Sequence, residues 1–198
     1  MLLGLASSTL LSSITATALA QQGPSAAETA PAANYWGRFA LGFGVSILAH
    51  ETAHILTSFA LGAHPYIAFS KGRPTVYSGI DSDLHPHKQF VFSAAGLVTQ
   101  SLINEAILDI PHAGGGAIER GILAGGIGTT LFYITLGRNG SVSDISVMAR
   151  TSSLSKTQLS LIFGGVSAIQ AWRISRDPRY QHFFVRPTAN GAVFGFSY

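Results

Sequence analysis

Long apolar stretches separated by short polar segments dominate the chain, and four of them are typical of helices. They cover residues 39–61, 90–110, 117–136 and 159–172. About 20 apolar residues at 1.5 Å per residue cross the hydrocarbon core of a bilayer, and the first three stretches reach that length. The fourth is short but ends in Trp172-Arg173, a pair typical of membrane interfaces. The pattern therefore predicts a mainly α-helical protein, a polytopic membrane bundle of three or four spans.

The segment between the first two apolar stretches has a different texture. Residues 66–70 and 75–80 are rich in β-branched and aromatic side chains, and residues 71–74 between them have the composition of a turn. We expect a small β-hairpin here, followed by a solvated loop. Two acidic side chains and then two imidazoles occupy every second position of that loop, at Asp81, Asp83, His85 and His87.

The two ends of the chain differ from its apolar body. Residues 1–20 have the apolar core and small-residue end of a secretory signal but lack its basic start, so they are either a signal peptide or a signal anchor. Residues 21–34, rich in Ala, Pro, Gln and Ser, predict a flexible linker. We assign residues 35–175 to the membrane-embedded domain and 176–198 to a C-terminal tail. Alternating aromatic side chains in residues 192–198 predict one β-strand in that tail.

Polar side chains on the apolar stretches fall on single helical faces. At spacings of three or four residues, the first stretch carries Ser46, His50, His54 and Thr57. In the same way, the second carries Ser93, Gly96, Gln100 and Asn104. Polar groups inside a membrane need partners, so we expect these two faces to pack against each other. The third stretch carries Gly121, Gly125 and Thr129 at four-residue spacing, which predicts close helix packing.

Composition strengthens the membrane interpretation. Of the 198 residues, 47% are hydrophobic and 11% are charged, whereas soluble domains carry about 25% charge. The net charge of +3 comes without a basic run, which gives no indication of a nucleic-acid partner. The chain has no cysteine, so a metal site in it must use His, Asp or Glu.

The first apolar stretch contains an H-E-x-x-H motif, formed by residues 50–54. On a helix His50 and His54 share one face, so both imidazoles can bind a single Zn²⁺. Glu51 can then act as the catalytic general base on a water that the metal activates. Ionisable groups are costly at hydrocarbon depth and usually have a function there. The motif therefore predicts a zinc site inside the membrane.

A third protein ligand normally completes such a site, and one candidate is Glu105. The segment Asn104-Glu105-Ala106-Ile107-Leu108-Asp109 resembles the N-E-A-x-x-D signature of thermolysin-like peptidases. This resemblance implies that Glu105 binds the metal. It also implies that Asp109 supports a ligand histidine from the second shell. The signature lies further from the H-E-x-x-H motif than in that family, because the hairpin segment intervenes.

The other candidate is Asp144, which follows a chain break at residues 138–140. The H-E-x-x-H motif in a span, the hairpin, the striped second span and this aspartate together resemble the site-two protease family of intramembrane zinc metalloproteases. The resemblance covers roughly residues 36–150 and implies that Asp144 is the third ligand. It also implies that Asn104 or Gln100 binds substrate, and that residues 66–80 pair with an extended substrate strand. The family's Leu-Asp-Gly motif is absent at Asp144. His85, His87 or water remain further alternatives for this ligand.

These observations predict a membrane-embedded zinc-dependent peptidase that cleaves a membrane protein or peptide by means of metal-activated water. The expected partners are that substrate and the lipid bilayer, and the expected location is the inner (cytoplasmic) membrane of a bacterium. A non-catalytic, protease-like scaffold that binds metal or another membrane protein is the main alternative. Ion transport along the polar faces is a third.

Overall fold

The computed structural model describes residues 26–180 apart from 71 and 113, and also residues 183–188 and 191–196. This part of the chain is mainly helical, with two small antiparallel sheets. In chain order its elements are α1 (Ala26–Ala60), β1 (Tyr66–Ser70), β2 (Arg73–Tyr77), α2 (Pro86–Asp109), α3 (Ala117–Ile134), α4 (Asp144–Arg150), α5 (Lys156–Arg176), a 3₁₀ turn (Pro178–Tyr180), β3 (Phe183–Thr188) and β4 (Gly191–Phe196). The predictions of a mainly α-helical fold and of a small hairpin between the first two long helices are confirmed.

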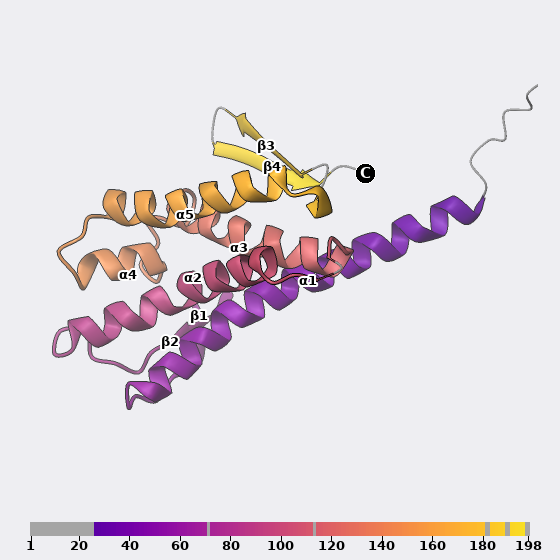
Figure 1. Ribbon diagram of the computed structural model, residues 1–198. Helices are drawn as coiled ribbons and strands as arrows, with labels where there is room; N and C mark the ends of the chain where they lie inside the picture. Colours follow the sequence, from indigo (N-terminus) through magenta and orange to yellow (C-terminus); the bar gives the residue numbers. More distant parts are fainter. Residues whose placement is uncertain (1–25, 71, 113, 181–182, 189–190, 197–198) are drawn as a thin grey trace, which may run out of the picture.

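The four long helices lie alongside one another, and α1 extends beyond the others at its N-terminal end (Figure 1). Close approach of α1 and α3 depends on glycine. A Cβ atom on Gly121 would lie 2.1 Å from the carbonyl oxygen of Phe39, and one on Gly125 would lie 2.6 Å from the Cβ of Ser46. Any larger residue would force the helices apart, as expected for small residues at a helix interface. This contact brings α3 against the polar face of α1.

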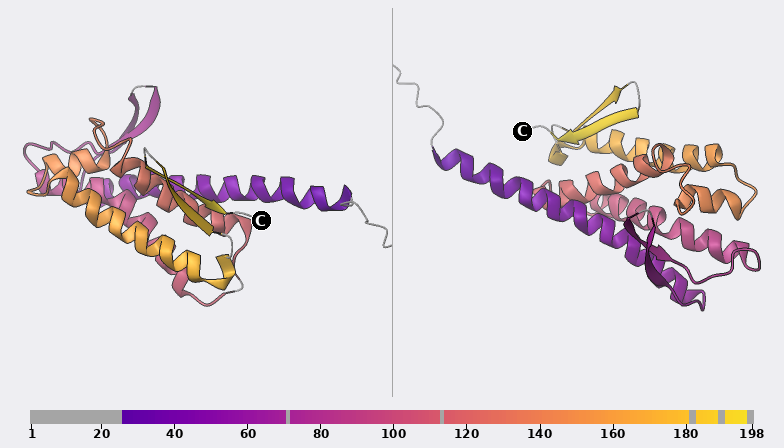
Figure 2. Two further views of the ribbon diagram at one scale, coloured as in Figure 1. Left: turned by 90° about the horizontal axis from the view of Figure 1, so that it is seen from above. Right: turned by 180° about the vertical axis from the view of Figure 1, so that it is seen from behind.

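Both sheets are two-stranded hairpins. In the first, β1 pairs antiparallel with β2, with Tyr66 opposite Tyr77 and their rings stacked 5.2 Å apart. In the second, β3 pairs with β4. The single strand predicted for the tail is therefore half of a hairpin, because the preceding residues supply its partner. This second hairpin lies against α5, away from the first one (Figure 2).

The predicted N-terminal linker overlaps the first helix. Residues 26–34, expected to belong to a flexible linker, form the beginning of α1. Five of these nine residues are alanine, which has the highest helix propensity, and this favours the helix although Pro31 lacks a backbone N–H donor. The predicted signal segment, residues 1–20, and the first part of the linker lie outside the described residues.

Two of the described helices, residues 34–60 of α1 and all of α2, are long and apolar enough to cross a membrane. This is a statement of length and composition alone. The described helices α3 and α5 do not reach the same standard, although both were predicted to lie in the membrane. Glu119 and Arg120 lower the mean hydropathy at the start of α3, and Ser, Thr and Gln side chains lower it in α5.

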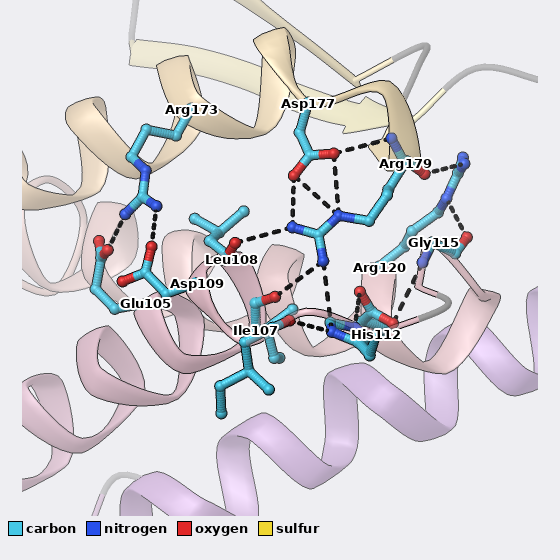
Figure 3. A network of polar contacts seen from close by, with 12 residues as sticks. Glu105, Ile107, Leu108, Asp109, His112, Gly115, Arg120, Arg173, Asp177 and Arg179 are labelled. Atoms are coloured by element: carbon cyan, nitrogen blue, oxygen red, sulfur yellow. Dashed lines mark hydrogen bonds and ion pairs between the residues drawn. The ribbon is translucent and has the colours of Figure 1, made fainter.

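Polar contacts at one end of the bundle hold α5 against α2. Arg173 of α5 forms ion pairs with both Glu105 and Asp109 of α2 (Figure 3). Beyond the end of α5, Arg179 pairs with Asp177 and donates to the carbonyl oxygen of Leu108 at 2.9 Å. Arg173 therefore pairs with both carboxylates at the end of α2, and Arg179 binds the backbone there.

Candidate metal centre

His50, His54 and Asp144 come together inside the bundle although Asp144 is 90 residues from the nearer histidine in sequence. Both histidines lie on the buried face of α1, and Asp144 is the first residue of α4. Their exposed fractions are 1%, 3% and 6%, and one ligand atom from each lies within 4.8 Å of the others. This buried group can hold a metal ion.

The potential ligand atoms converge on one point. The Oδ2 atom of Asp144 lies 3.1 Å from Nε2 of His50 and 3.4 Å from Nε2 of His54. The two Nε2 atoms are 3.1 Å apart. Two imidazole nitrogens and one carboxylate oxygen therefore face each other across a small space, which is the donor set of a three-ligand metal site.

The hydrogen-bond partners of the two Nδ1 atoms determine the tautomer of each histidine. His54 Nδ1 lies 2.7 Å from the carbonyl oxygen of Phe92, which can only accept a hydrogen bond, so Nδ1 carries a proton and donates. Gln100 lies 3.0 Å from His50 Nδ1 through its Oε1 atom, while its Nε2 donates to the carbonyl oxygen of Ser46 at 3.1 Å. His50 Nδ1 must then donate to Gln100. In neutral imidazoles both Nε2 atoms therefore have a lone pair and no proton, so each can accept a hydrogen bond or bind a metal ion.

This pattern leaves an excess of acceptors at the centre. Neither Nε2 atom has a proton to share, and the Oδ2 atom of Asp144 is buried without a hydrogen-bond donor. Three acceptors enclosed together are unfavourable unless a positive charge lies between them. A metal ion, or protons on the imidazoles, would satisfy all three acceptors.

A large cleft leads from the surface to this group. Its volume is about 1250 Å³, and Glu51, His54 and Asp144 line it together. One wall is formed by residues 74–83 of the first hairpin and the segment after it, and the other by the loop that joins α3 to α4. Glu51, the predicted base, is half-buried and lines the cleft from α1, next to His50 in the sequence.

The structure also places side chains at the centre that the sequence did not single out. The ring of Tyr133 from α3 stacks on His50 at 5.5 Å, and the ring of Phe92 packs against His54 at 4.8 Å. Aromatic residues within apolar helices give no distinguishing signal in the sequence. Their positions relative to the histidines follow from the packing of α2 and α3 on α1.

Glu105 and Asp109, the residues of the thermolysin-like motif, are not part of the histidine group. Both carboxylates bind Arg173 (Figure 3). Glu105 also accepts a hydrogen bond from Gln170 at 3.0 Å. Both residues lie on the side of α2 that faces α5. Asp144, and not Glu105, is the carboxylate that lies beside the histidines. His85 and His87 are exposed and also lie outside the group.

Asn104 and Gln100, predicted to bind substrate, are buried between helices and do not line the cleft. Asn104 donates to Oε1 of Gln170 at 3.1 Å, while its Oδ1 atom is buried without a partner. Gln100 contacts α1 and α3 as well as His50. The amides of both residues are thus directed into the bundle.

Comparisons of this chain with protein-family models, with curated proteins and with solved structures gave no match.

Proposed function

We propose that this chain is a membrane-embedded zinc peptidase that resembles the site-two protease family in the arrangement of its site. One observation carries the proposal: a potential base, Glu51, lines an open cleft together with a buried group of two histidines and an aspartate. A purely structural metal site has no need of an accessible carboxylate beside its ligands. The cleft makes the group reachable from solvent, as catalysis requires.

Zinc is the metal that best suits this donor set. Two neutral imidazoles and one carboxylate, with a position left for water, form a common arrangement of catalytic zinc sites. Bound Zn²⁺ would supply Lewis acidity, polarising a carbonyl group and making water a stronger acid. His50, His54 and Asp144 would hold it.

Glu51 would take the proton from the attacking water and pass it to the leaving nitrogen of the peptide bond. Its position supports this role because it follows a ligand directly in sequence and faces the cleft. Tyr133 and Phe92 would exclude bulk water from one side of the centre, since both rings pack against the histidines.

The shape of the cleft favours a polypeptide substrate. Ten consecutive residues, 74–83, line it, whereas β1 contributes Tyr66 to the wall. Residues of β2 therefore lie along the cleft, where this strand would be placed to pair with an extended segment of substrate. A substrate helix from the membrane would have to unwind to bind in this way, because its backbone groups are otherwise satisfied internally.

The proposal includes a membrane location for the whole bundle, with α3 and α5 embedded beside α1 and α2. His50 lies ten residues before the end of α1, about 15 Å along the helix axis. The centre would then lie within the apolar layer, and the inner membrane of a bacterium is the setting we favour. The substrate would be a membrane protein or a peptide at the membrane surface.

The experiment compares the wild type with Glu51→Gln, purified in detergent and loaded with zinc. Fluorescein-labelled casein, an unfolded polypeptide, is the probe. We expect Glu51→Gln to retain bound zinc and to lose at least 100-fold in cleavage rate, because general-base catalysis contributes about 10²–10⁴-fold. Glu119→Gln, which alters a carboxylate outside the cleft, is the matched control and should cleave normally.

Equal cleavage by Glu51→Gln and the wild type would overturn the assigned role of Glu51. Absence of cleavage by every variant, together with full zinc content, would favour the scaffold that binds metal or another membrane protein.

A further inference from the structure

Gln100 is a buried glutamine of α2 whose side chain contacts two other helices, α1 and α3. It belongs to α2, is 1% exposed, and uses both ends of its amide. Its Oε1 atom accepts from Nδ1 of His50 at 3.0 Å. Its Nε2 atom donates to the carbonyl oxygen and the hydroxyl of Ser46 on α1, at 3.1 and 3.0 Å, and lies 3.3 Å from the hydroxyl of Thr129 on α3.

These contacts fix which end of the amide faces His50. A flipped amide would place an NH₂ group against Nδ1 of His50 and an oxygen against the carbonyl oxygen of Ser46, where two acceptors would repel. The observed orientation of the amide is therefore compatible with only one hydrogen-bond pattern, in which Oε1 accepts and Nδ1 of His50 is protonated. Nε2 of His50 is consequently the nitrogen left for the centre, 3.1 Å from Asp144.

The ring of His50 is also fixed in direction. Tyr133 stacks on it with an interplanar angle of 11°. Gly96 of α2 lies so close to the ring that an added Cβ would be 2.4 Å from its Cε1 atom. With the hydrogen bond to Gln100, the imidazole is therefore restrained by an aromatic face, a glycine backbone and an amide oxygen.

We propose that Gln100 is a positioning residue for the metal centre, which keeps His50 in the tautomer and direction that binding requires, rather than a substrate-binding residue. The inference rests on the proposed metal site but not on its peptidase activity. Without this amide, Nδ1–H of His50 would be buried with no acceptor, and the ring would gain by moving its proton to Nε2. A proton on Nε2 blocks the coordinating lone pair.

The chain offers a matched control in Gln170 of α5. This glutamine is also 1% exposed, and it also binds α2 through a backbone carbonyl and two side chains. Its partners, Ser101, Asn104 and Glu105, do not belong to the histidine group. A leucine at either position removes a buried amide of the same size, but only the change at position 100 removes a contact to a ligand.

The test measures zinc affinity of the full chain in detergent, by competition with a chromophoric chelator after the metal has been stripped. We expect Gln100→Leu to bind Zn²⁺ about 10–100-fold more weakly than the wild type, the usual effect of losing an outer partner of a ligand. Gln170→Leu should bind zinc as the wild type does, even where its melting temperature falls.

A second measurement applies if Gln100→Leu does not fold. Nitrogen NMR of the metal-free wild type, labelled at histidine and assigned with a His50→Gln sample, reports which ring nitrogen carries the proton. We expect a proton on Nδ1 of His50. Absence of a proton from Nδ1 of His50, or equal zinc affinity in Gln100→Leu and the wild type, would overturn the proposal. Either result leaves the cleavage assay of Glu51→Gln untouched, so failure of the positioning role and failure of the peptidase proposal are distinguishable.

Discussion

At the scale of single residues, the centre is defined by what surrounds the histidines as much as by the histidines themselves. Their outer nitrogens donate to Gln100 and to the carbonyl oxygen of Phe92, and their inner nitrogens face Asp144. This arrangement collects acceptors around one point and excludes donors from it. A cation is the simplest group that satisfies all three.

Gly96→Ala tests how tightly α2 packs on the centre. The new methyl group would overlap the ring of His50, so the ring or the helix must move. We expect a loss of about 1–3 kcal/mol in stability, as for overpacking of a core. We also expect at least tenfold weaker zinc binding, measured by chelator competition.

Gly44→Ala is the control for that change. It lies on the same helix as the histidines, and nothing lies within 4 Å of the added atom. This variant should bind zinc normally and be at least as stable as the wild type, since alanine favours helix over glycine. Normal zinc binding by Gly96→Ala would mean that contact with α2 does not constrain His50.

The sequence predicted this residue-level picture in part. His50, Glu51 and His54 were identifiable because their spacing matches the helix repeat, which is local information. The approach of Asp144 depends on a turn of the chain between α3 and α4, which no local pattern encodes. The sequence therefore left Asp144 and Glu105 as alternatives, and the tertiary packing separates them.

At the scale of helices, α4 supplies the third potential ligand of the centre and α5 packs against α4. Asp144 opens α4, and Ile145 and Met148 of the same helix pack with Leu159 of α5 and Leu97 of α2 in one apolar cluster. At its other end, α5 is held by Arg173. The position of Asp144 therefore depends on helices that are fixed to α2 by apolar contacts at one end and ion pairs at the other.

Arg173→Ala tests this attachment of α5. The guanidinium serves two carboxylates of α2 but is about one-third exposed, so solvent screens the pairs. We expect a loss on the order of 1 kcal/mol in stability. The measurement is thermal unfolding in detergent. Arg176→Ala, which removes an exposed arginine stacked over Trp172, should have a smaller effect. Equal melting temperatures for the two variants would show that the ion pairs to α2 contribute nothing.

The predicted and observed bounds of the helices agree where the apolar stretch is long. The hairpin at residues 66–77 and the second and third long helices appear close to where they were expected. The start of α1 and the strand pairing in the tail differ, because alanine propensity and a partner strand decide those regions, and neither belongs to the apolar pattern. The exact number of membrane spans also depends on polar residues in α3 and α5 that pack inside the bundle.

At the scale of the whole molecule, α1 and α2 cross the membrane antiparallel in our account. The chain has no native cysteine, so single cysteines report sidedness without background. Ser82→Cys lies before α2 and Pro111→Cys lies after it, and both native residues are exposed. In intact cells a membrane-impermeant maleimide should label one of them, and disruption of the membrane should allow labelling of both. Labelling of both sites from the same side would contradict a crossing by α2.

The central claim is that His50, His54 and Asp144 bind one metal ion, and the metal content of the purified protein tests it most directly. Elemental analysis by inductively coupled plasma mass spectrometry should find about one zinc per chain in the wild type, as for a single catalytic site. His54→Ala and Asp144→Ala should lose the zinc, while Glu105→Ala should retain it because that carboxylate binds Arg173. Absence of metal from the wild type, or loss of zinc in Glu105→Ala with retention in Asp144→Ala, would contradict the account.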